Sequence, residues 1–143
     1  MDRLNERLDI ARKALASFKE LAVAAHEDAI QRDAAIKRFE LAFEAVWKAA
    51  QRAAQDAGKG PVGSPKTCIR WCREDGLLSE EDAESALRLV GDRNLATHTY
   101  ALKLAVELDS RLPAHAALLG RWLAAIERRA RERIAEGVPA RRF

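Results

Sequence analysis

Residues 28–57 read DAIQRDAAIKRFELAFEAVWKAAQRAAQDA, and no other segment constrains the architecture as strongly. Large apolar side chains recur along it at steps of three and four residues, at Ile36, Phe39, Phe43, Val46 and Trp47. That spacing puts them on one wide face of an α-helix, which turns once every ~3.6 residues. We therefore expect a long helix from about Asp28 to Ala57, with this aromatic face at the centre of the core.

The same period continues on both sides of this helix. Upstream, it predicts an amphipathic helix of about five turns, with apolar positions at Leu4, Leu8, Ala11, Leu15, Phe18 and Ala22. Downstream, residues 58–63 (GKGPVG) are typical of a loop. Ser64-Pro65 predicts an N-cap followed by proline at the first position of a short helix that stops at Gly76. Ser79 and the acidic residues after it resemble a capping box that opens another helix.

Helical spacing resumes after residue 100 and continues to Leu112. Pro113 is expected to break or restart the helix, because proline has no N–H to donate. A last helix follows, with apolar positions at Leu118, Leu119, Trp122, Leu123 and Ile126. Since no strand-like alternation is present, the sequence predicts an all-α protein: an antiparallel up-down helical bundle of four to five main helices. We assign residues 1–136 to the bundle and 137–143 to a short basic C-terminal tail.

Length and composition restrict the class of protein. The chain has 143 residues, of which 33% are charged and 48% hydrophobic, a balance typical of one soluble helical domain. Its net charge of +3 permits contact with nucleic acid without arguing for it. We find no signal peptide or membrane span and expect a cytoplasmic protein. Cys68 and Cys72 lack neighbouring metal ligands and are interpreted as small apolar residues; no metal or cofactor is predicted.

The segment RNLATHTY, residues 93–100, gathers the polar groups best suited to chemistry. Arg93 cannot lose its charge, whereas His98 can titrate near neutral pH, and this combination suits phosphodiester chemistry. On one straight helix the two lie about 140° apart around the axis, while Asn94 shares a face with His98 and Tyr100 shares one with Arg93. We therefore expect either a helix junction or a site shared between two subunits. The alternative is a helix end with satisfied polar groups.

The remaining polar and aromatic residues receive ordinary interpretations. His26 and His115 are interpreted as surface or loop histidines, and the three tryptophans as core or interface anchors. Glu40 and Glu44 share one helical face and are expected to pair with Arg38, Lys48 or the motif arginine. The arginine-rich segment from Arg128 is interpreted as a helix C-terminus that complements the helix dipole.

Several short pieces resemble one family when they are taken in order. They are Arg38-Phe39-Glu40, Phe43-Glu44, Trp47-Lys48, Ser64-Pro65-Lys66 and Arg93-Asn94-x3-His98-Thr99-Tyr100. The chain resembles, from about Leu4 to Ile126, the HEPN proteins described as nucleotidyltransferase substrate-binding subunits. These include toxins that are paired with minimal nucleotidyltransferase antitoxins. The resemblance implies a helical bundle that forms homodimers.

The resemblance also implies a function for the motif. Arg93, Asn94 and His98 match residues to which the family's metal-independent RNA cleavage is attributed, and Tyr100 matches a tyrosine that the partner nucleotidyltransferase modifies with AMP. The expected partners are a second copy of the chain, a minimal nucleotidyltransferase encoded nearby, and an RNA substrate such as tRNA or mRNA. The rival interpretation is a non-catalytic subunit that binds a substrate or nucleotide for the partner enzyme. A third is a structural dimer without activity.

Overall fold

The computed structural model describes residues 2–23, 25–98 and 101–137. Over these ranges the chain forms α-helices and one short 3-10 helix, with no strand, so the predicted all-α class is confirmed. The elements are α1 (Arg3–Lys19), α2 (Ala29–Asp56), α3 (Pro65–Glu74), α4 (Glu80–Leu95), η1 (Ala96–His98) and α5 (Leu102–Ala135).

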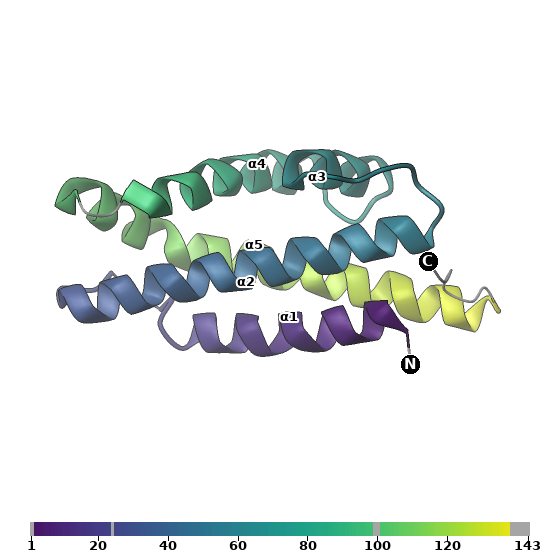
Figure 1. The fold of residues 1–143 in the computed structure, drawn as a ribbon, viewed down its shortest axis with the longest axis horizontal. Helices are drawn as coiled ribbons and strands as arrows, with labels where there is room; N and C mark the ends of the chain where they lie inside the picture. The colour runs from purple at the N-terminus through teal and green to yellow at the C-terminus, as the bar shows by residue number, and fades with distance from the viewer. Residues whose placement is uncertain (1, 24, 99–100, 138–143) are drawn as a thin grey trace.

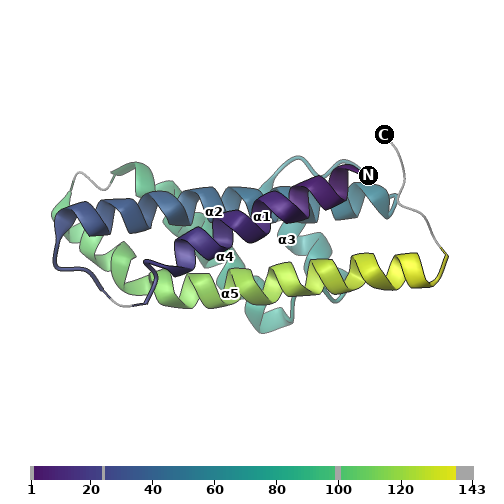
Figure 2. The same ribbon diagram turned by 90° about the horizontal axis from the view of Figure 1, so that it is seen from below.

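The helices form an antiparallel up-down bundle in which α3 packs against α4 on one side (Figure 1). Helices α2 and α5 pack against each other at the centre. Helix α1 packs on one side of this pair, and α4 packs on both α2 and α5 from the other side. The view from below shows α1 lying across α2 and α5 (Figure 2). The predicted architecture is therefore confirmed, with α2 in the central place expected for it.

The core is built on the aromatic face of α2. Phe39 is fully buried and lies with its ring centroid 5.8 Å from that of Phe18 in α1. The three tryptophans, Trp47, Trp71 and Trp122, are all buried, as expected for anchors of the bundle. Each large apolar side chain stabilises the folded state by about 1.5–3 kcal/mol when it is fully buried, so this face supplies much of the favourable free energy of folding.

Local signals set the helix ends where the sequence predicts them. The Ser64 hydroxyl accepts a hydrogen bond from the Thr67 backbone N–H at 3.2 Å, and Pro65 takes the first helical position. The Ser79 hydroxyl likewise accepts from the Asp82 N–H at 3.0 Å. Gly76, with φ of 81°, follows the C-cap residue Asp75 of α3 and adopts the left-handed conformation that glycine tolerates best.

The prediction that Pro113 breaks or restarts the helix is wrong. Helix α5 runs without interruption from Leu102 to Ala135 and contains Pro113 in its interior. A proline inside a helix costs about 3 kcal/mol or more. That cost is outweighed because Leu108, Leu112 and other residues on both sides of the proline are buried, at about 1.5–3 kcal/mol for each large side chain.

The C-terminal end of the chain is only partly described. Helix α5 ends at Ala135, and residues 138–143 of the predicted basic tail lie outside the described residues. The division between bundle and tail therefore stays a prediction. Across the part of the chain that the structure covers, no helix combines the length and apolar character needed to cross a membrane.

Candidate functional site at the end of helix α4

The motif segment lies at a helix junction. Helix α4 ends at Leu95, the 3-10 turn η1 ends at His98, and α5 begins at Leu102. The segment therefore does not form one straight helix. A helix junction is one of the two arrangements expected from its side-chain geometry. Tyr100 lies outside the described residues.

Arg93 projects from the last turn of α4 toward α2. Its Nη2 atom lies 3.8 Å from Oε2 of Glu44, and both side chains are nearly half exposed. The same carboxylate oxygen accepts a hydrogen bond from Nε1 of Trp47 at 3.1 Å. The expected pairing of Glu44 with the motif arginine is therefore confirmed, although exposed ion pairs of this kind contribute only about 0–1 kcal/mol. Arg38 instead pairs with Glu20 at 3.0 Å.

Asn94 and His98 are both exposed at this junction. The Thr97 hydroxyl donates to the Asn94 carbonyl at 2.9 Å, which satisfies one of the carbonyls left open at the end of a helix. The His98 carbonyl accepts from the Ala101 N–H at 3.3 Å. The backbone of the junction is thus held by local hydrogen bonds while the Asn94 and His98 side chains lie at the surface.

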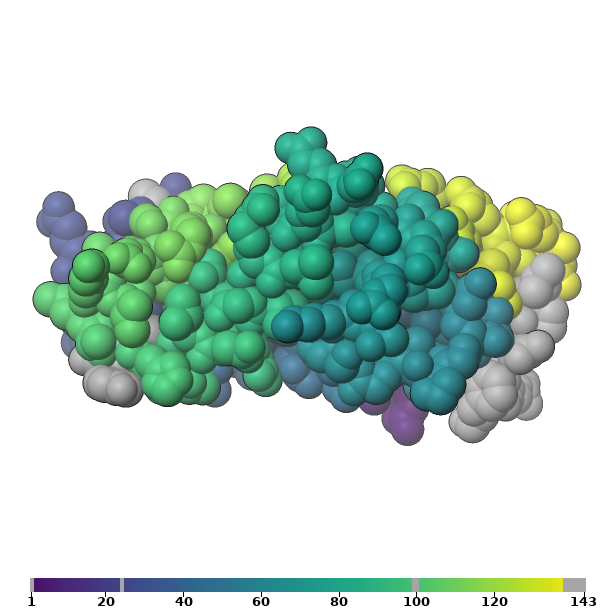
Figure 3. Space-filling view, turned by 90° about the horizontal axis from the view of Figure 1, so that it is seen from above, coloured from purple at the N-terminus to yellow at the C-terminus, as the bar shows by residue number. Residues whose placement is uncertain are grey.

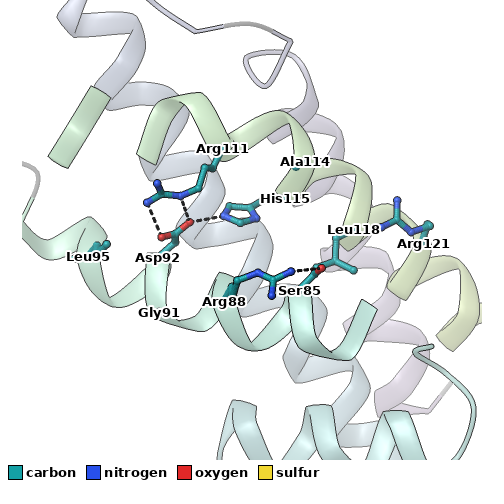
Figure 4. Close-up of a pocket in the computed structure, with 10 residues that line it drawn as sticks. All are labelled: Ser85, Arg88, Gly91, Asp92, Leu95, Arg111, Ala114, His115, Leu118 and Arg121. Carbon is teal, nitrogen blue, oxygen red and sulfur yellow. Dashed lines mark hydrogen bonds and ion pairs between the residues drawn. The ribbon is translucent and has the colours of Figure 1, made fainter. Parts of the chain in front are cut away.

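A second polar cluster lies on the α5 side of α4, and sequence reasoning missed it (Figure 4). Arg111 donates to both carboxylate oxygens of Asp92, from Nε at 2.7 Å and from Nη2 at 2.8 Å. His115 Nε2 lies 2.7 Å from the same carboxylate, and the imidazole stacks on Phe39 with centroids 5.3 Å apart. We call Asp92, Arg111 and His115 the buried network, after its two buried members; the Arg111 side chain is 42% exposed.

The protonation states of the buried network follow from burial and hydrogen bonding. Burial raises the pKa of Asp92, but hydrogen bonds from Arg111 and His115 outweigh it, so that the pKa is below its ordinary value. Burial lowers the pKa of His115 below its ordinary value, more than the Asp92 carboxylate raises it. At neutral pH we therefore assign a charged Asp92 and a neutral His115 that donates from Nε2.

The interpretation of His115 as a surface or loop residue is wrong. It is buried within α5, because α4 and α5 run antiparallel and bring Asp92 opposite it. One sequence signal could have indicated this network. Arg111 and His115 are four residues apart and so share one helical face, and the preceding helix carries the carboxylate Asp92. His26 does lie in a loop, but its side chain is nearly buried, with Nδ1 2.9 Å from Oδ1 of Asp109.

The described residues contain no group of three or more His, Cys, Asp or Glu residues arranged to hold a metal ion. Cys68 and Cys72 are buried free thiols on α3, as small apolar residues would be. Nε1 of Trp122 donates to the sulfur of Cys72 at 3.3 Å, so this thiol packs within the core.

Comparisons with known proteins give one family match and three similar solved structures. A family model described as "Nucleotidyltransferase substrate binding protein like" matches residues 6–128. A protein of Thermus thermophilus with a known crystal structure is 46% identical, with a TM-score of 0.76 over 81% of this chain and 98% of that one. No curated protein matches.

Two further structures resemble the chain in fold. A mutant of the toxin-antitoxin MntA-HpeT is 16% identical, with a TM-score of 0.72 over 87% of this chain and 97% of that one. A toxin-antitoxin with AMP-PNP is 15% identical, with a TM-score of 0.68 over 88% of this chain and 99% of that one. At these identities the likeness concerns the arrangement of helices alone.

Proposed function

We propose a function from the premise that this chain belongs to the nucleotidyltransferase substrate binding protein like family. It acts as the HEPN subunit of a two-component system with a minimal nucleotidyltransferase, as a metal-independent endoribonuclease toxin that its partner neutralises. The observation that carries this proposal is the exposure of Arg93, Asn94 and His98 at one helix junction. Two structural neighbours described as toxin-antitoxin agree with it.

The chemistry assigns one step to each side chain. His98 takes the proton of a ribose 2′-hydroxyl, whose oxygen attacks the adjacent phosphorus. The bond to the 5′-oxygen breaks, and that oxygen takes a proton from His98 of a second copy in a homodimer. Arg93 binds the phosphate and stabilises the charge that develops on it, while Asn94 orients His98 or contacts the phosphate. The products are a 2′,3′-cyclic phosphate and a 5′-hydroxyl.

The Arg93–Glu44 pair leaves the arginine available for this role. At 3.8 Å the two groups are beyond normal hydrogen-bond distance, and the exposed pair is worth about 0–1 kcal/mol. A charge-assisted hydrogen bond to a phosphate contributes about 1.5–3 kcal/mol, and a guanidinium forms two at once. Substrate therefore displaces Glu44 at low cost.

Purified chain tests the proposed cleavage. RNA should be cut in the presence of EDTA, and His98→Ala should slow cutting by about 10²–10⁴-fold, because proton transfer is lost. Arg93→Lys should also lose cleavage, since an ammonium group cannot form the bidentate contact to the phosphate. Arg131→Ala, which removes an exposed arginine of the distal part of α5, is the control and should cut normally. Cleavage that survives His98→Ala, or that needs magnesium, would contradict the mechanism.

Neutralisation is assigned to Tyr100. The partner transfers AMP from ATP to the tyrosine hydroxyl with release of pyrophosphate, which places a bulky anion two residues from His98 and repels RNA. Co-expression with the neighbouring nucleotidyltransferase should add the mass of AMP to the chain, and Tyr100→Phe should abolish the addition. An unchanged mass with an active partner and ATP would contradict this assignment.

The second candidate is a non-catalytic subunit that binds a substrate or nucleotide for the partner. It is favoured by a groove of about 640 Å³ between α4 and α5, which is of the size of small-molecule sites. Absence of cleavage across RNA types, with partner binding intact, would select this function. Both candidates act in the cytoplasm as homodimers, and a monomer at micromolar concentration in light scattering would contradict the shared site.

A further inference from the structure

The groove between α4 and α5, which favours the second candidate function, lies apart from the motif junction, and its lining indicates what kind of ligand it would hold. Helix α4 lies on the face shown in Figure 3, with α5 emerging on either side of it. Both helices line the groove, and their side chains in it are drawn in Figure 4. The lining consists of arginines, one histidine, one carboxylate and small or apolar residues: Ser85, Arg88, Gly91, Asp92, Leu95, Arg111, Ala114, His115, Leu118 and Arg121.

Most charges around the groove are already paired. Asp92 is held by Arg111 and His115, and Arg121 donates to both carboxylate oxygens of Asp82, at 3.1 and 3.0 Å. Glu107 and Glu81 lie close enough to raise the pKa of Arg111 and Arg121 respectively, which adds negative charge near the rim. The region is therefore nearly neutral in sum and offers no diffuse attraction to polyanions.

Arg88 is the exception among the lining arginines. It is exposed, and its Nη2 donates to the neutral Ser85 hydroxyl at 3.1 Å, with no carboxylate partner in the described part of the chain. Figure 4 shows its guanidinium between the two helices, on the side of Leu118. An exposed guanidinium at the wall of a groove, without a carboxylate partner in the described residues, is suited to a single phosphate group, which it can hold by two parallel hydrogen bonds.

The rest of the groove suits a flat apolar group. Leu95 from α4, which is partly exposed, and the exposed Ala114 from α5 supply apolar surface beside Arg88, over the buried Leu118. We propose that the groove binds one nucleotide unit, with its phosphate on Arg88 and its base against Leu95 and Ala114. This inference rests on the proposed function and deepens it, because it names the chemical class of ligand and places it beside, and not in, the motif junction.

Calorimetric titration of the full chain with two ligands tests the inference. The ligands are AMP, and hexathymidylate DNA, which lacks the 2′-hydroxyl and cannot be cleaved by the proposed mechanism. Arg88→Ala should raise the Kd by about tenfold or more, because the charge-assisted contact to the phosphate is lost; tenfold corresponds to about 1.4 kcal/mol. Arg131→Ala removes the same charge from an exposed site in the distal part of α5 and should change the Kd less than about twofold.

A second pair of variants probes the groove from α5. Ala114 is exposed within the lining, and both Glu and Gln are good helix formers. Ala114→Glu places a negative charge beside the phosphate and should abolish measurable binding, whereas the equally large Ala114→Gln should retain most of it. Melting curves confirm that all variants are folded.

The outcomes separate this inference from the proposed catalysis. If AMP binding depends on Arg88, the ligand of the groove is a free nucleotide. If only hexathymidylate binding depends on Arg88, the ligand is a nucleotide unit within a nucleic-acid strand. No binding of either ligand, or equal effects of Arg88→Ala and Arg131→Ala, would overturn the inference. His98→Ala should lose cleavage and keep the Kd, so failure of catalysis leaves the groove standing and failure of binding leaves the cleavage test unaffected.

Discussion

Asp92 and Arg93 are consecutive residues of α4, yet they belong to clusters that differ in burial, geometry and strength. Asp92 faces α5, has a side chain only 10% exposed, and is bound at 2.7–2.8 Å by Arg111 and His115. Arg93 faces α2, is 44% exposed, and meets Glu44 at 3.8 Å. A rotation of about 100° around the helix axis separates a carboxylate committed to folding from a guanidinium that stays available to a ligand.

The largest expected effect on stability comes from removing the centre of the buried network. Asp92→Ala leaves the Arg111 guanidinium and the buried His115 without their acceptor. Loss of one partner of a buried pair costs about 3–5 kcal/mol, and we expect about 2–3 here because Arg111 stays partly in water. Urea unfolding measures the change. The control is Asp82→Ala, which breaks an Arg121 pair that is more exposed and should cost less than about 1 kcal/mol.

A smaller effect is expected from pH, and His115 and Asp92 of the buried network should contribute to it. Because the pKa of His115 is lowered in the folded protein, the unfolded chain binds more protons just below its ordinary pKa of about 6.5. The contribution of His115 to stability is therefore complete above that pH and is lost as the pH falls toward the folded pKa. Asp92, whose pKa is also lowered, loses its contribution at still lower pH, below about 3.9.

Unfolding free energies measured from about pH 7.5 to about pH 5, on either side of the ordinary histidine pKa of about 6.5, test this. The wild type should lose stability on acidification more steeply than His115→Asn, which has no group to titrate at this position. Parallel curves would show that His115 does not couple protonation to folding.

The smallest effect on stability is expected at Arg93 itself. Arg93→Ala removes an exposed side chain whose ion pair is long, and the free energy of unfolding should change by less than about 1 kcal/mol. A thermal melt of this variant beside Asp92→Ala makes the contrast directly. A loss at Arg93 equal to that at Asp92 would mean that both residues serve the fold, and would weaken the catalytic proposal.

The fold was predictable because its signals are local. The aromatic period of α2 and the Ser64 and Ser79 caps act over a few residues, and each is found where the sequence places it. Pro113 was misread because its local cost is outweighed by burial against other helices.

The candidate site divides in the same way. The junction that presents Arg93, Asn94 and His98 is one of the two arrangements that the side-chain angles along one helix left open, the other being a site shared between two subunits. The buried network could not be expected in advance, because Asp92 meets partners 19 and 23 residues further along the chain, on a helix whose packing no short pattern specifies. His115 was therefore assigned to the surface although its position in α5 buries it.

The connection between α1 and α2 is fastened by a residue that is made much later. Asp109 accepts from the backbone N–H of His26 at 2.6 Å and contacts its ring, across 83 positions of sequence. At a synthesis rate of about 5–20 residues per second, Asp109 follows His26 by roughly 4–17 seconds. The α1–α2 hairpin is therefore synthesised several seconds before Asp109 is available. The first turn of the protein to be translated is among the last to gain its long-range hydrogen bonds.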